Sequence, residues 1–272
     1  MFNLGFIGGG NMATAIAKGI LNDNAHPSSN MWVSGPRLHN LRQWSEFGAN
    51  TTTKNGEVFA NCDVVFLGVK PNMLNTAVDE CISTLPSGKS KPVLFISMLG
   101  GVTIDQLHKA LKSLNVNVIR IMPNTPMMVG TGACLYTPDL TVSEEQCFLL
   151  EKLLNGCGLC EKVPEYLIDS LGSLTACGPA FMYIVIEALA DGAVKQGVPR
   201  DTAIRMAAQM VKGSGQMVLK AGKHPAILKD EVCSAGGSTI CGVAALEQGK
   251  IRSTLIAAVE ASTLRSRELG KK

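Results

Sequence analysis

Short apolar runs alternate with longer amphipathic segments through roughly the first 160 residues of the chain. Runs rich in β-branched and aromatic residues predict strands, whereas apolar residues spaced three or four apart predict helices. This alternation is typical of a parallel sheet whose strands are joined by right-handed helical crossovers. The predicted strands span 3–7, 31–34, 64–69, 93–97 and 116–121, and the predicted helices between them span 11–21, 74–82 and 104–114.

A last pair of predicted strands, 133–136 and 159–163, flanks a helix that Ser143 is placed to cap, with Gln146 at the capping-box position. After Pro164 only helical patterns follow. We therefore expect two domains: an α/β domain with a parallel-sheet core over residues 1–163 and an all-α domain over residues 164–272. The helices predicted in the second domain span 179–195, 200–220, 239–248 and 251–269.

The predicted helix 179–195 is apolar on nearly every face, so it must be covered on all sides. An all-helical domain of about a hundred residues buries too little surface to cover it alone. We therefore expect part of the cover to come from a second copy of the chain, in a homodimer. The longest apolar run, 174–190, is interrupted by Gly178, Pro179 and Glu187, which favours a buried helix over a membrane span.

Composition and charge narrow the class of protein. The chain has 272 residues, of which 46% are hydrophobic and 17% charged, and this excludes a disordered chain. The formal net charge is only +3, and the sequence has no basic cluster of the kind that binds nucleic acid. We expect small anionic ligands, with neither nucleic acid nor a membrane as a partner.

The nine cysteines are scattered and mostly lie in apolar surroundings, as reduced and buried thiols of an intracellular protein do. Cys157 and Cys160 form the only Cys-x-x-Cys pair. With no second pair and no neighbouring His, two ordinary strand-edge cysteines are favoured over a zinc or redox site, and we expect no metal. No basic leader precedes the first strand, so the expected compartment is the cytoplasm.

A glycine-rich turn follows the first predicted strand. Residues 8–13 read Gly-Gly-Gly-Asn-Met-Ala, which fits the dinucleotide-binding pattern G-x-G-x-x-A between a strand and a helix. Gly8 permits the tight turn, Gly10 lets a pyrophosphate approach the backbone, and the helix N-terminus offers free N–H groups to it. We therefore expect a Rossmann-like domain with Gly8, Gly10, Asn11 and Met12 in the cofactor site.

The end of the second strand selects the cofactor, because a carboxylate there binds the ribose 2′-hydroxyl of NAD. Residues 33–37 contain no carboxylate, whereas Ser34 and Arg37 supply a hydroxyl and a guanidinium suited to a phosphate. This favours NADP, with NADPH preferred over NADH. The alternative is that Arg37 is a solvated residue of the following turn.

Two further segments follow strands and are expected at the nicotinamide half of the cofactor. The first is Val69, Lys70 and Pro71, and the second is Met98, Leu99 and Gly100. Both lie at carboxyl ends of parallel strands, where such ligands bind. Lys70 is equally consistent with an ordinary charge at the rim.

In the helical domain, residues 234–239 read Ser-Ala-Gly-Gly-Ser-Thr and precede a helix. Two adjacent glycines with flanking hydroxyls at a helix start can converge several N–H groups on one carboxylate. The alternative is a Ser/Thr N-cap on a flexible turn. The loop contains no His, Asp or Glu, and His224 is interpreted as a turn residue.

These segments resemble those of the pyrroline-5-carboxylate reductase family over nearly the whole chain. The segment 234–239 is similar to the family signature and is the most specific of them, whereas 6–12 is shared with many dehydrogenases. The segments that carry the resemblance are 6–12, 69–71, 124–126, 177–181, 224–225, 228–230 and 234–239.

The resemblance implies reduction of 1-pyrroline-5-carboxylate to L-proline with NADPH or NADH. It also implies a helical domain that interlocks with a second subunit, often in a ring of five dimers, a decamer. By the same resemblance, Asn55 lies by the adenosine phosphate. Hydride transfer to an imine carbon leaves the imine nitrogen in need of a hydrogen-bond donor, for which Thr239 is the candidate. Substrate binding is assigned to Ser234, Gly236, Gly237, Ser238 and Thr239.

Two rival functions remain at this stage. A β-hydroxyacid dehydrogenase has a similar two-domain plan, but it needs a catalytic Lys early on the first long helix of the second domain, and helix 179–195 has no Lys before Lys195. A noncatalytic NADP-binding regulator would need only the first domain. The anion-binding loop of the second domain argues against it.

Overall fold

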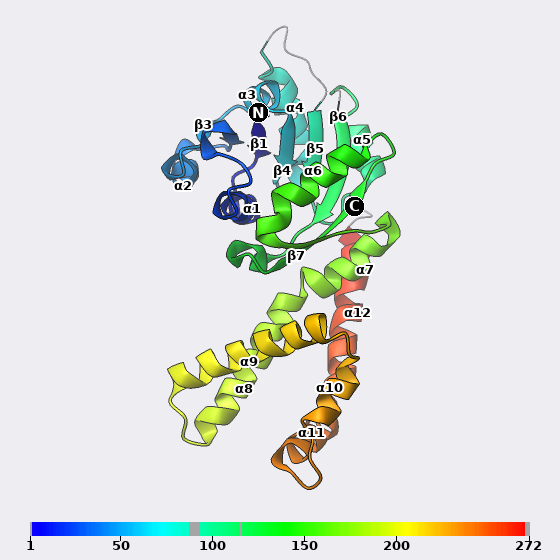
Figure 1. Ribbon diagram of the computed structural model, residues 1–272. Coiled ribbons are helices and arrows are strands. Elements are labelled where there is room, and N and C mark those ends of the chain that lie inside the picture. Colours follow the sequence, from blue (N-terminus) through cyan, green and yellow to red (C-terminus); the bar gives the residue numbers. More distant parts are fainter. Residues whose placement is uncertain (1, 87–92, 115, 270–272) are drawn as a thin grey trace. The chain divides into compact units, whose positions relative to one another are not determined.

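An eight-stranded sheet organises the N-terminal part of the protein in the computed structural model, which describes residues 2–86, 93–114 and 116–269 (Figure 1). The strands are β1 (Leu4–Ile7), β2 (Met31–Ser34), β3 (Asn50–Thr52), β4 (Val64–Leu67), β5 (Val93–Ser97), β6 (Val116–Met122), β7 (Gly132–Pro138) and β8 (Gly158–Lys162). Their order is β3-β2-β1-β4-β5-β6-β7-β8. Neighbours are parallel except β6 and β7, which are antiparallel. The winding therefore reverses at β1, and the crevice at the carboxyl ends of β1 and β4 is where such sheets bind ligands.

The helices alternate with the strands and then continue alone. The α-helices are α1 (Asn11–Asn22), α2 (Arg42–Glu46), α3 (Asn55–Asn61), α4 (Leu74–Ser83), α5 (Ile104–Ala110), α6 (Glu144–Leu154), α7 (Glu165–Thr175), α8 (Gly178–Lys195), α9 (Arg200–Ala221), α10 (Pro225–Glu231), α11 (Ser238–Gln248) and α12 (Ile251–Leu269). Short 3-10 helices are η1 (Ser28–Asn30), η2 (Leu38–Leu41), η3 (Pro71–Met73), η4 (Thr125–Val129) and η5 (Asn155–Cys157).

The predicted fold class is confirmed, and each predicted strand is present within two residues of its expected bounds. The predicted capping box at the start of α6 is also present, because Gln146 N donates to Ser143 Oγ and Ser143 N donates to Gln146 Oε1. Strand β3 was not predicted. It consists of the three polar residues Asn50–Thr52 and exists because it pairs with β2.

Two apolar cores lie on opposite faces of the sheet. Along β4, Val64 and Phe66 belong to the core that α1 and α6 cover, whereas Val65 and Leu67 belong to the core that α3, α4 and α5 cover. Successive side chains of a strand point to opposite faces, so a strand buried on both faces must be apolar throughout. This is why β4 reads as a continuous apolar run and not as an alternating one.

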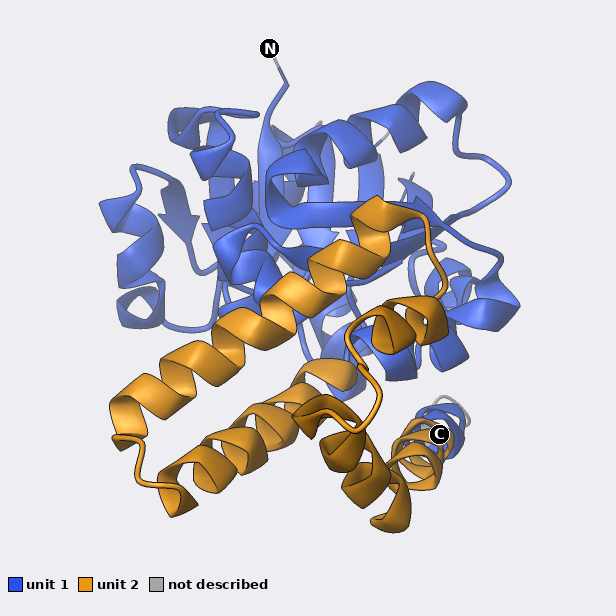
Figure 2. Ribbon diagram, turned by 60° about the horizontal axis from the view of Figure 1, so that its bottom comes forward, with its two compact units in different colours: residues 1–177, 262–272 blue, residues 178–261 orange. Residues whose placement is uncertain are grey.

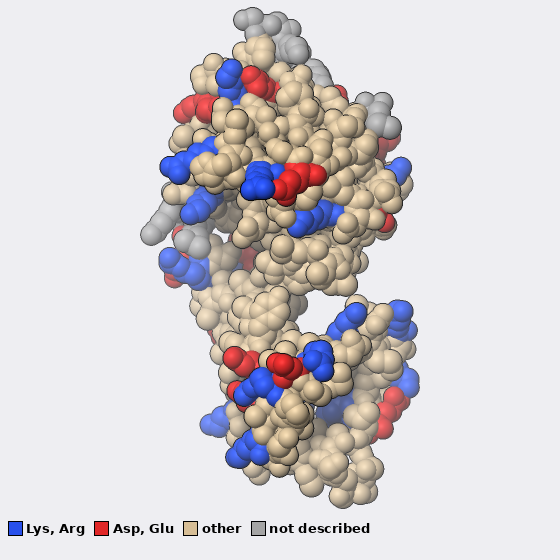
Figure 3. All heavy atoms as spheres, turned by 90° about the vertical axis from the view of Figure 1, so that its left-hand side faces the viewer, with Lys and Arg blue, Asp and Glu red and all other residues tan. Residues whose placement is uncertain are grey.

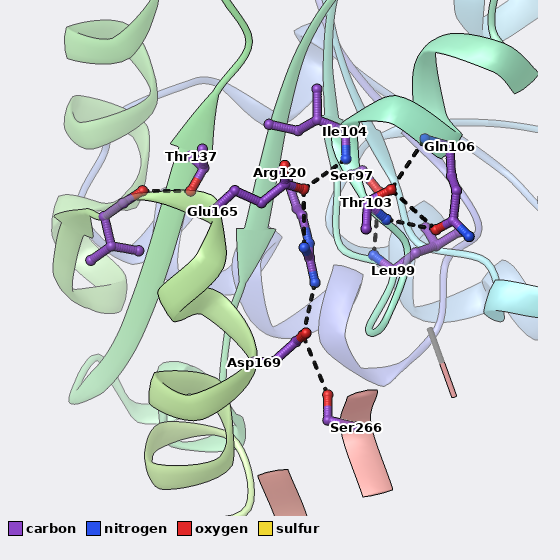
Figure 4. A network of polar contacts seen from close by, with 11 residues as sticks. Ser97, Leu99, Thr103, Ile104, Gln106, Arg120, Thr137, Glu165, Asp169 and Ser266 are labelled. Atoms are coloured by element: carbon purple, nitrogen blue, oxygen red, sulfur yellow. Dashed lines mark hydrogen bonds and ion pairs between the residues drawn. The ribbon is translucent and has the colours of Figure 1, made fainter. Parts of the chain in front are cut away.

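A buried arginine joins β6 to three other elements (Figure 4). The Arg120 side chain is 1% exposed, and its Nη1 and Nη2 atoms donate to Glu165 and Asp169 of α7, each at 3.1 Å. Glu165 Oε1 also accepts from Ile104 N at the start of α5, at 2.8 Å. Asp169 Oδ1 also accepts from Ser266 Oγ in the last turns of α12. One guanidinium thus fixes α7 and the end of α12 to the sheet.

The chain divides into two compact units (Figure 2). Unit 1 comprises residues 1–177 and 262–272, and unit 2 comprises residues 178–261. This division differs from the predicted one between residues 163 and 164. The physical reason is the anchoring of α7 and the end of α12 on the sheet, to which Asn124 adds by donating from Nδ2 to Thr175 O at 3.0 Å.

Helix α8, the most apolar helix of unit 2, is largely exposed within the single chain. Small side chains of α8 and α9 pack together around Ala190, Ala203 and Ala207. Ala190 is the one residue of α8 that is buried within this single chain, whereas Tyr183 and Ile184 are about 60% exposed or more. The expectation that this helix is buried is therefore not met by the chain alone.

The described residues contain one helical stretch, 165–195, that is long and apolar enough to cross a membrane by length and composition. The stretch comprises two helices, α7 and α8, and the acidic side chains Glu165 and Asp169 of the first are paired with Arg120. A single stretch of this kind is weak support for a membrane span. The length and composition of this stretch nevertheless correct the expectation that Gly178, Pro179 and Glu187 interrupt the apolar run too much for a candidate membrane span.

Candidate functional site

The glycine-rich turn lies at the reversal point of the sheet. Gly8 has φ of +96°, and a Cβ atom there would lie 2.8 Å from Gly68 O, so the turn requires glycine on both counts. Gly8 N donates to Ser34 O at 3.0 Å, which ties the turn to the end of β2. A Cβ atom on Gly10 would meet no described atom within 4 Å, so this residue leaves open space before α1. This is the arrangement that admits a pyrophosphate at a helix N-terminus.

A cavity of about 530 Å³ opens beside this turn, within the range of small-molecule sites. It lies wholly in unit 1 and extends from the glycine turn across the ends of β2, β3 and β4 to α4. Its lining consists of Gly8, Gly9, Gly10, Gly35, Pro36, Asn40, Leu41, Thr53, Asn55, Val69, Lys70, Met73, Thr76, Ala77 and Glu80.

The cavity brings together five of the predicted cofactor residues, namely Gly8, Gly10, Asn55, Val69 and Lys70. The other predicted cofactor residues do not line it: Asn11, Met12, Ser34, Arg37, Pro71, Met98, Leu99 and Gly100. Their assignment to the site stays a prediction.

One wall of the cavity was not predicted: it is formed by Met73 of η3 and by Thr76, Ala77 and Glu80 of α4. Thr53 was missed as well, because the short strand β3 that precedes it was not predicted. A signal for the α4 residues was available, since the helix that follows the strand 64–67 must start at the carboxyl edge of the sheet. The side of α4 that faces the cavity depends on how the helix packs against the sheet, so the individual residues could not be named from the sequence.

Asn55 sits at the centre of a hydrogen-bonded group at the end of β2. Ser34 is fully buried, and its hydroxyl donates to Asn55 Oδ1 at 2.7 Å. Asn55 Nδ2 donates to Ala77 O at 3.2 Å, and Asn55 N donates to both carboxylate oxygens of Glu80 at 3.1 Å. In this structure Ser34 therefore positions Asn55 and does not itself face the cavity.

Two predicted cationic groups are available to a ligand. Arg37 and Lys70 are both exposed, and within the described ranges neither side chain has an ion pair or a hydrogen bond to the protein. Lys70 lines the cavity, whereas Arg37 lies just beyond Gly35 and Pro36, which do line it. A guanidinium without a protein partner is free to bind a phosphate.

The loop after β5 places its three predicted residues in different surroundings. Leu99 is 1% exposed and packs in the core with α4 and α5, so only its backbone remains for a ligand. The Met98 methyl group lies against Gly68 beside the glycine turn. Gly100 is exposed with open space around it.

In unit 2, the loop before α11 keeps the features of an anion-binding turn. Gly236 has φ of +66°, and Gly237 N donates to Ser234 O at 3.1 Å. Helix α11 begins at Ser238 with Gly237 as its N-cap, and no side chain of the described residues caps it. The first N–H groups of α11 are therefore left for a ligand. Thr239 is an exposed residue inside the helix, so the alternative that it serves as the N-cap is wrong.

Other candidate residues have structural roles. His224 is the N-cap of α10, where its Nδ1 accepts from Ala226 N at 3.2 Å. Burial raises the pKa of the Cys157 thiol to about 12, so it stays protonated at neutral pH, whereas metal binding and redox exchange need a thiolate. Among the residues that the structure describes, no group of three or more potential metal ligands is found.

The reversed sheet, the glycine turn and the cavity beside it are typical of a dinucleotide-binding protein of the Rossmann type. Comparisons with known proteins agree with this class. Residues 3–101 match the family "NADP oxidoreductase coenzyme F420-dependent", and residues 165–269 match the family "Pyrroline-5-carboxylate reductase dimerisation".

Whole-chain relatives are more specific. Pyrroline-5-carboxylate reductase 3 of Danio rerio is 43% identical over 269 residues, covering 99% of this chain and 92% of the relative. Pyrroline-5-carboxylate reductase of Arabidopsis thaliana is 39% identical, covering 99% and 96%. The crystal structure of Plasmodium falciparum pyrroline carboxylate reductase with NADP bound superposes with a TM-score of 0.86 at 33% identity, covering 99% and 98%. The chain belongs to the pyrroline-5-carboxylate reductase family and is an NAD(P)-dependent oxidoreductase.

Proposed function

We propose that the protein reduces 1-pyrroline-5-carboxylate to L-proline, the final step of proline synthesis, with NADPH as the preferred reductant. The observation that carries this proposal is the family relationship across 99% of the chain. The glycine turn, the cavity of about 530 Å³ and the uncapped start of α11 support it independently.

The residues present fit the cofactor and the substrate. NADPH, when bound, supplies a hydride to the imine carbon. The N–H groups at the start of α1 and the open space at Gly10 suit its pyrophosphate. In unit 2, Ser234 and the backbone of Gly237, Ser238 and Thr239 would hold the substrate carboxylate, with Gly236 shaping the loop. The Thr239 hydroxyl would donate to the imine nitrogen.

The test is a turnover assay with purified protein. NADPH oxidation should depend on added pyrroline-5-carboxylate and should yield proline, and NADH should be a poorer reductant at equal concentration. Binding of NADPH without turnover would favour the noncatalytic regulator. Turnover of a 3-hydroxy acid instead would favour the β-hydroxyacid dehydrogenase.

Cofactor preference provides a sharper prediction at Arg37. Arg37→Asp should raise the KM for NADPH about tenfold to a hundredfold, because a charge-assisted contact of about 1.5–3 kcal/mol is replaced by repulsion. The KM for NADH should change little, since NADH lacks the 2′-phosphate. Arg42→Asp, at an exposed residue whose partner is Glu46, is the matched control. Unchanged KM values for both cofactors would make Arg37 a solvated residue.

The protein is proposed to be a homodimer that assembles further, into a decamer, in the cytoplasm, without nucleic-acid or membrane partners. The exposed apolar side chains of α8 and the dimerisation-family match over 165–269 support a homo-oligomer. On the face shown in Figure 3, the described Lys and Arg side chains are scattered among Asp and Glu, unlike a nucleic-acid surface.

We expect no species smaller than a dimer at micromolar concentration. The reason is that the uncovered apolar face of α8 would otherwise stay in water. Light scattering of the purified protein measures this directly. A stable and active monomer of 28.8 kDa would contradict the assembly proposal.

A further inference from the structure

One acidic side chain, Glu80, reaches the wall of the cofactor cavity. Among the lining residues that the structure describes, Glu80 is the only acid and Lys70 the only base. Glu80 belongs to α4. The carboxylate that usually binds the ribose 2′-hydroxyl of a dinucleotide comes instead from the end of the second strand, where this chain has none. The cavity wall therefore carries a carboxylate that is not part of the dinucleotide-binding motif.

Hydrogen bonds hold this carboxylate close to the end of β2. Both Glu80 oxygens accept from Asn55 N at 3.1 Å, and Asn55 Oδ1 accepts from Ser34 Oγ at 2.7 Å. The next N–H of α3, that of Gly56, donates to Thr84 Oγ1 at 2.9 Å. The first two N–H groups of α3 are thus already occupied, by Glu80 of α4 and by its C-cap residue Thr84, and are not left for a phosphate.

The spacing between α3 and α4 makes this arrangement rigid. A Cβ atom on Gly56 would lie 2.4 Å from Leu85 N, so the start of α3 is packed directly against the end of α4. Glu80 is half-buried and cannot swing away without giving up both contacts to Asn55 N. Its charge therefore stays at the cavity wall.

We propose that Glu80 is a specificity-determining residue that weakens the preference for NADPH. Its carboxylate repels the 2′-phosphate that the free guanidinium of Arg37 attracts, while it has little effect on NADH, which carries no such phosphate. The ratio of the two affinities is then set by these opposed charges near the end of β2. This inference rests on the proposed use of NADPH.

The test is the ratio of the Kd for NADH to the Kd for NADPH, measured by calorimetry without substrate. Glu80→Gln removes the charge and keeps one oxygen to accept from Asn55 N, so the ratio should rise about threefold to tenfold. The rise should shrink in high salt, because screening weakens charge repulsion but not a hydrogen bond. Asp79→Asn is the matched control, since Asp79 is the adjacent exposed acid of α4 and does not line the cavity.

A second variant separates the charge from the hydrogen bond. Glu80→Asp keeps the charge on a shorter side chain, so its ratio should stay close to that of the unaltered protein even if its Tm falls. Three outcomes would overturn the proposal. They are an unchanged ratio of the two Kd values in Glu80→Gln, an equal rise of this ratio in Asp79→Asn, and loss of folded protein in both Glu80 variants. Failure of the unaltered protein to bind either dinucleotide would instead refute the proposed function.

Discussion

Arg120→Met is expected to lower the free energy of unfolding by about 3 kcal/mol, at the low end of the range for a broken buried ion pair. The guanidinium is 1% exposed, whereas its partners Glu165 and Asp169 have side chains 34% and 28% exposed. The carboxylates can therefore recover some water when the arginine is gone, which is why the upper end of the range is not expected. Arg120 Nε also lacks a hydrogen-bond partner within the described ranges, which makes the native pair less than ideal.

Chemical denaturation followed by circular dichroism measures the decrease in the free energy of unfolding. Hydrogen exchange shows which segments are destabilised. Exchange should accelerate first in α7 and in the last turns of α12, the segments that the network fixes. Arg42→Met is the matched control, because Arg42 pairs with Glu46 at the surface and should cost about 0.5 kcal/mol or less. Equal losses in the two variants would mean that the Arg120 network does not anchor these segments.

Thr239→Val is expected to lower kcat about tenfold to a thousandfold, the scale usual for removal of a hydrogen-bond donor that acts at the transition state. Valine keeps the shape of threonine and removes only the hydroxyl. The structure excludes one competing effect, because the N-cap of α11 is Gly237 and the change removes no cap. We therefore expect the Tm and the Kd for NADPH to stay unchanged.

Thr254→Val is the matched control for this substitution. Thr254 is an exposed helical threonine of the same unit whose hydroxyl donates to Lys250 O. Its kcat should equal that of the unaltered protein. If Thr239→Val also left kcat unchanged, the proton would come from solvent and the hydroxyl would have no catalytic part.

Local sequence patterns were sufficient to predict a feature when the residues that cause it lie within one short segment. The continuous apolar run of β4, the capping box of Ser143 and Gln146, and the glycine turn at Gly8 each depend on neighbours in sequence, and each is present as predicted. A turn is also present at 234–239, where Gly236 has φ of +66° and α11 begins at Ser238, whereas the binding of an anion there stays a prediction.

The features in which the structure differs from the sequence-based expectations depend on contacts between distant segments. Strand β3 has no apolar pattern and exists through its pairing with β2. The division between the units depends on Arg120 reaching α7 across 45 residues of sequence. Neither contact can be predicted from the periodicity of the sequence. The spacing of apolar residues indicates which face of a helix or strand is buried, but not which other element packs against that face.

The fold class, the glycine turn after β1 and the glycine-rich turn before α11 could all be predicted from the sequence, because each is encoded in backbone preferences and apolar spacing within a single segment. Three further features could be seen only in the folded protein: Ser34 is buried behind Asn55, Leu99 packs into the core, and Glu80 of α4 reaches the cavity. These outcomes depend on how helices rotate and pack against the sheet, which is settled by the close packing of side chains from many segments at once.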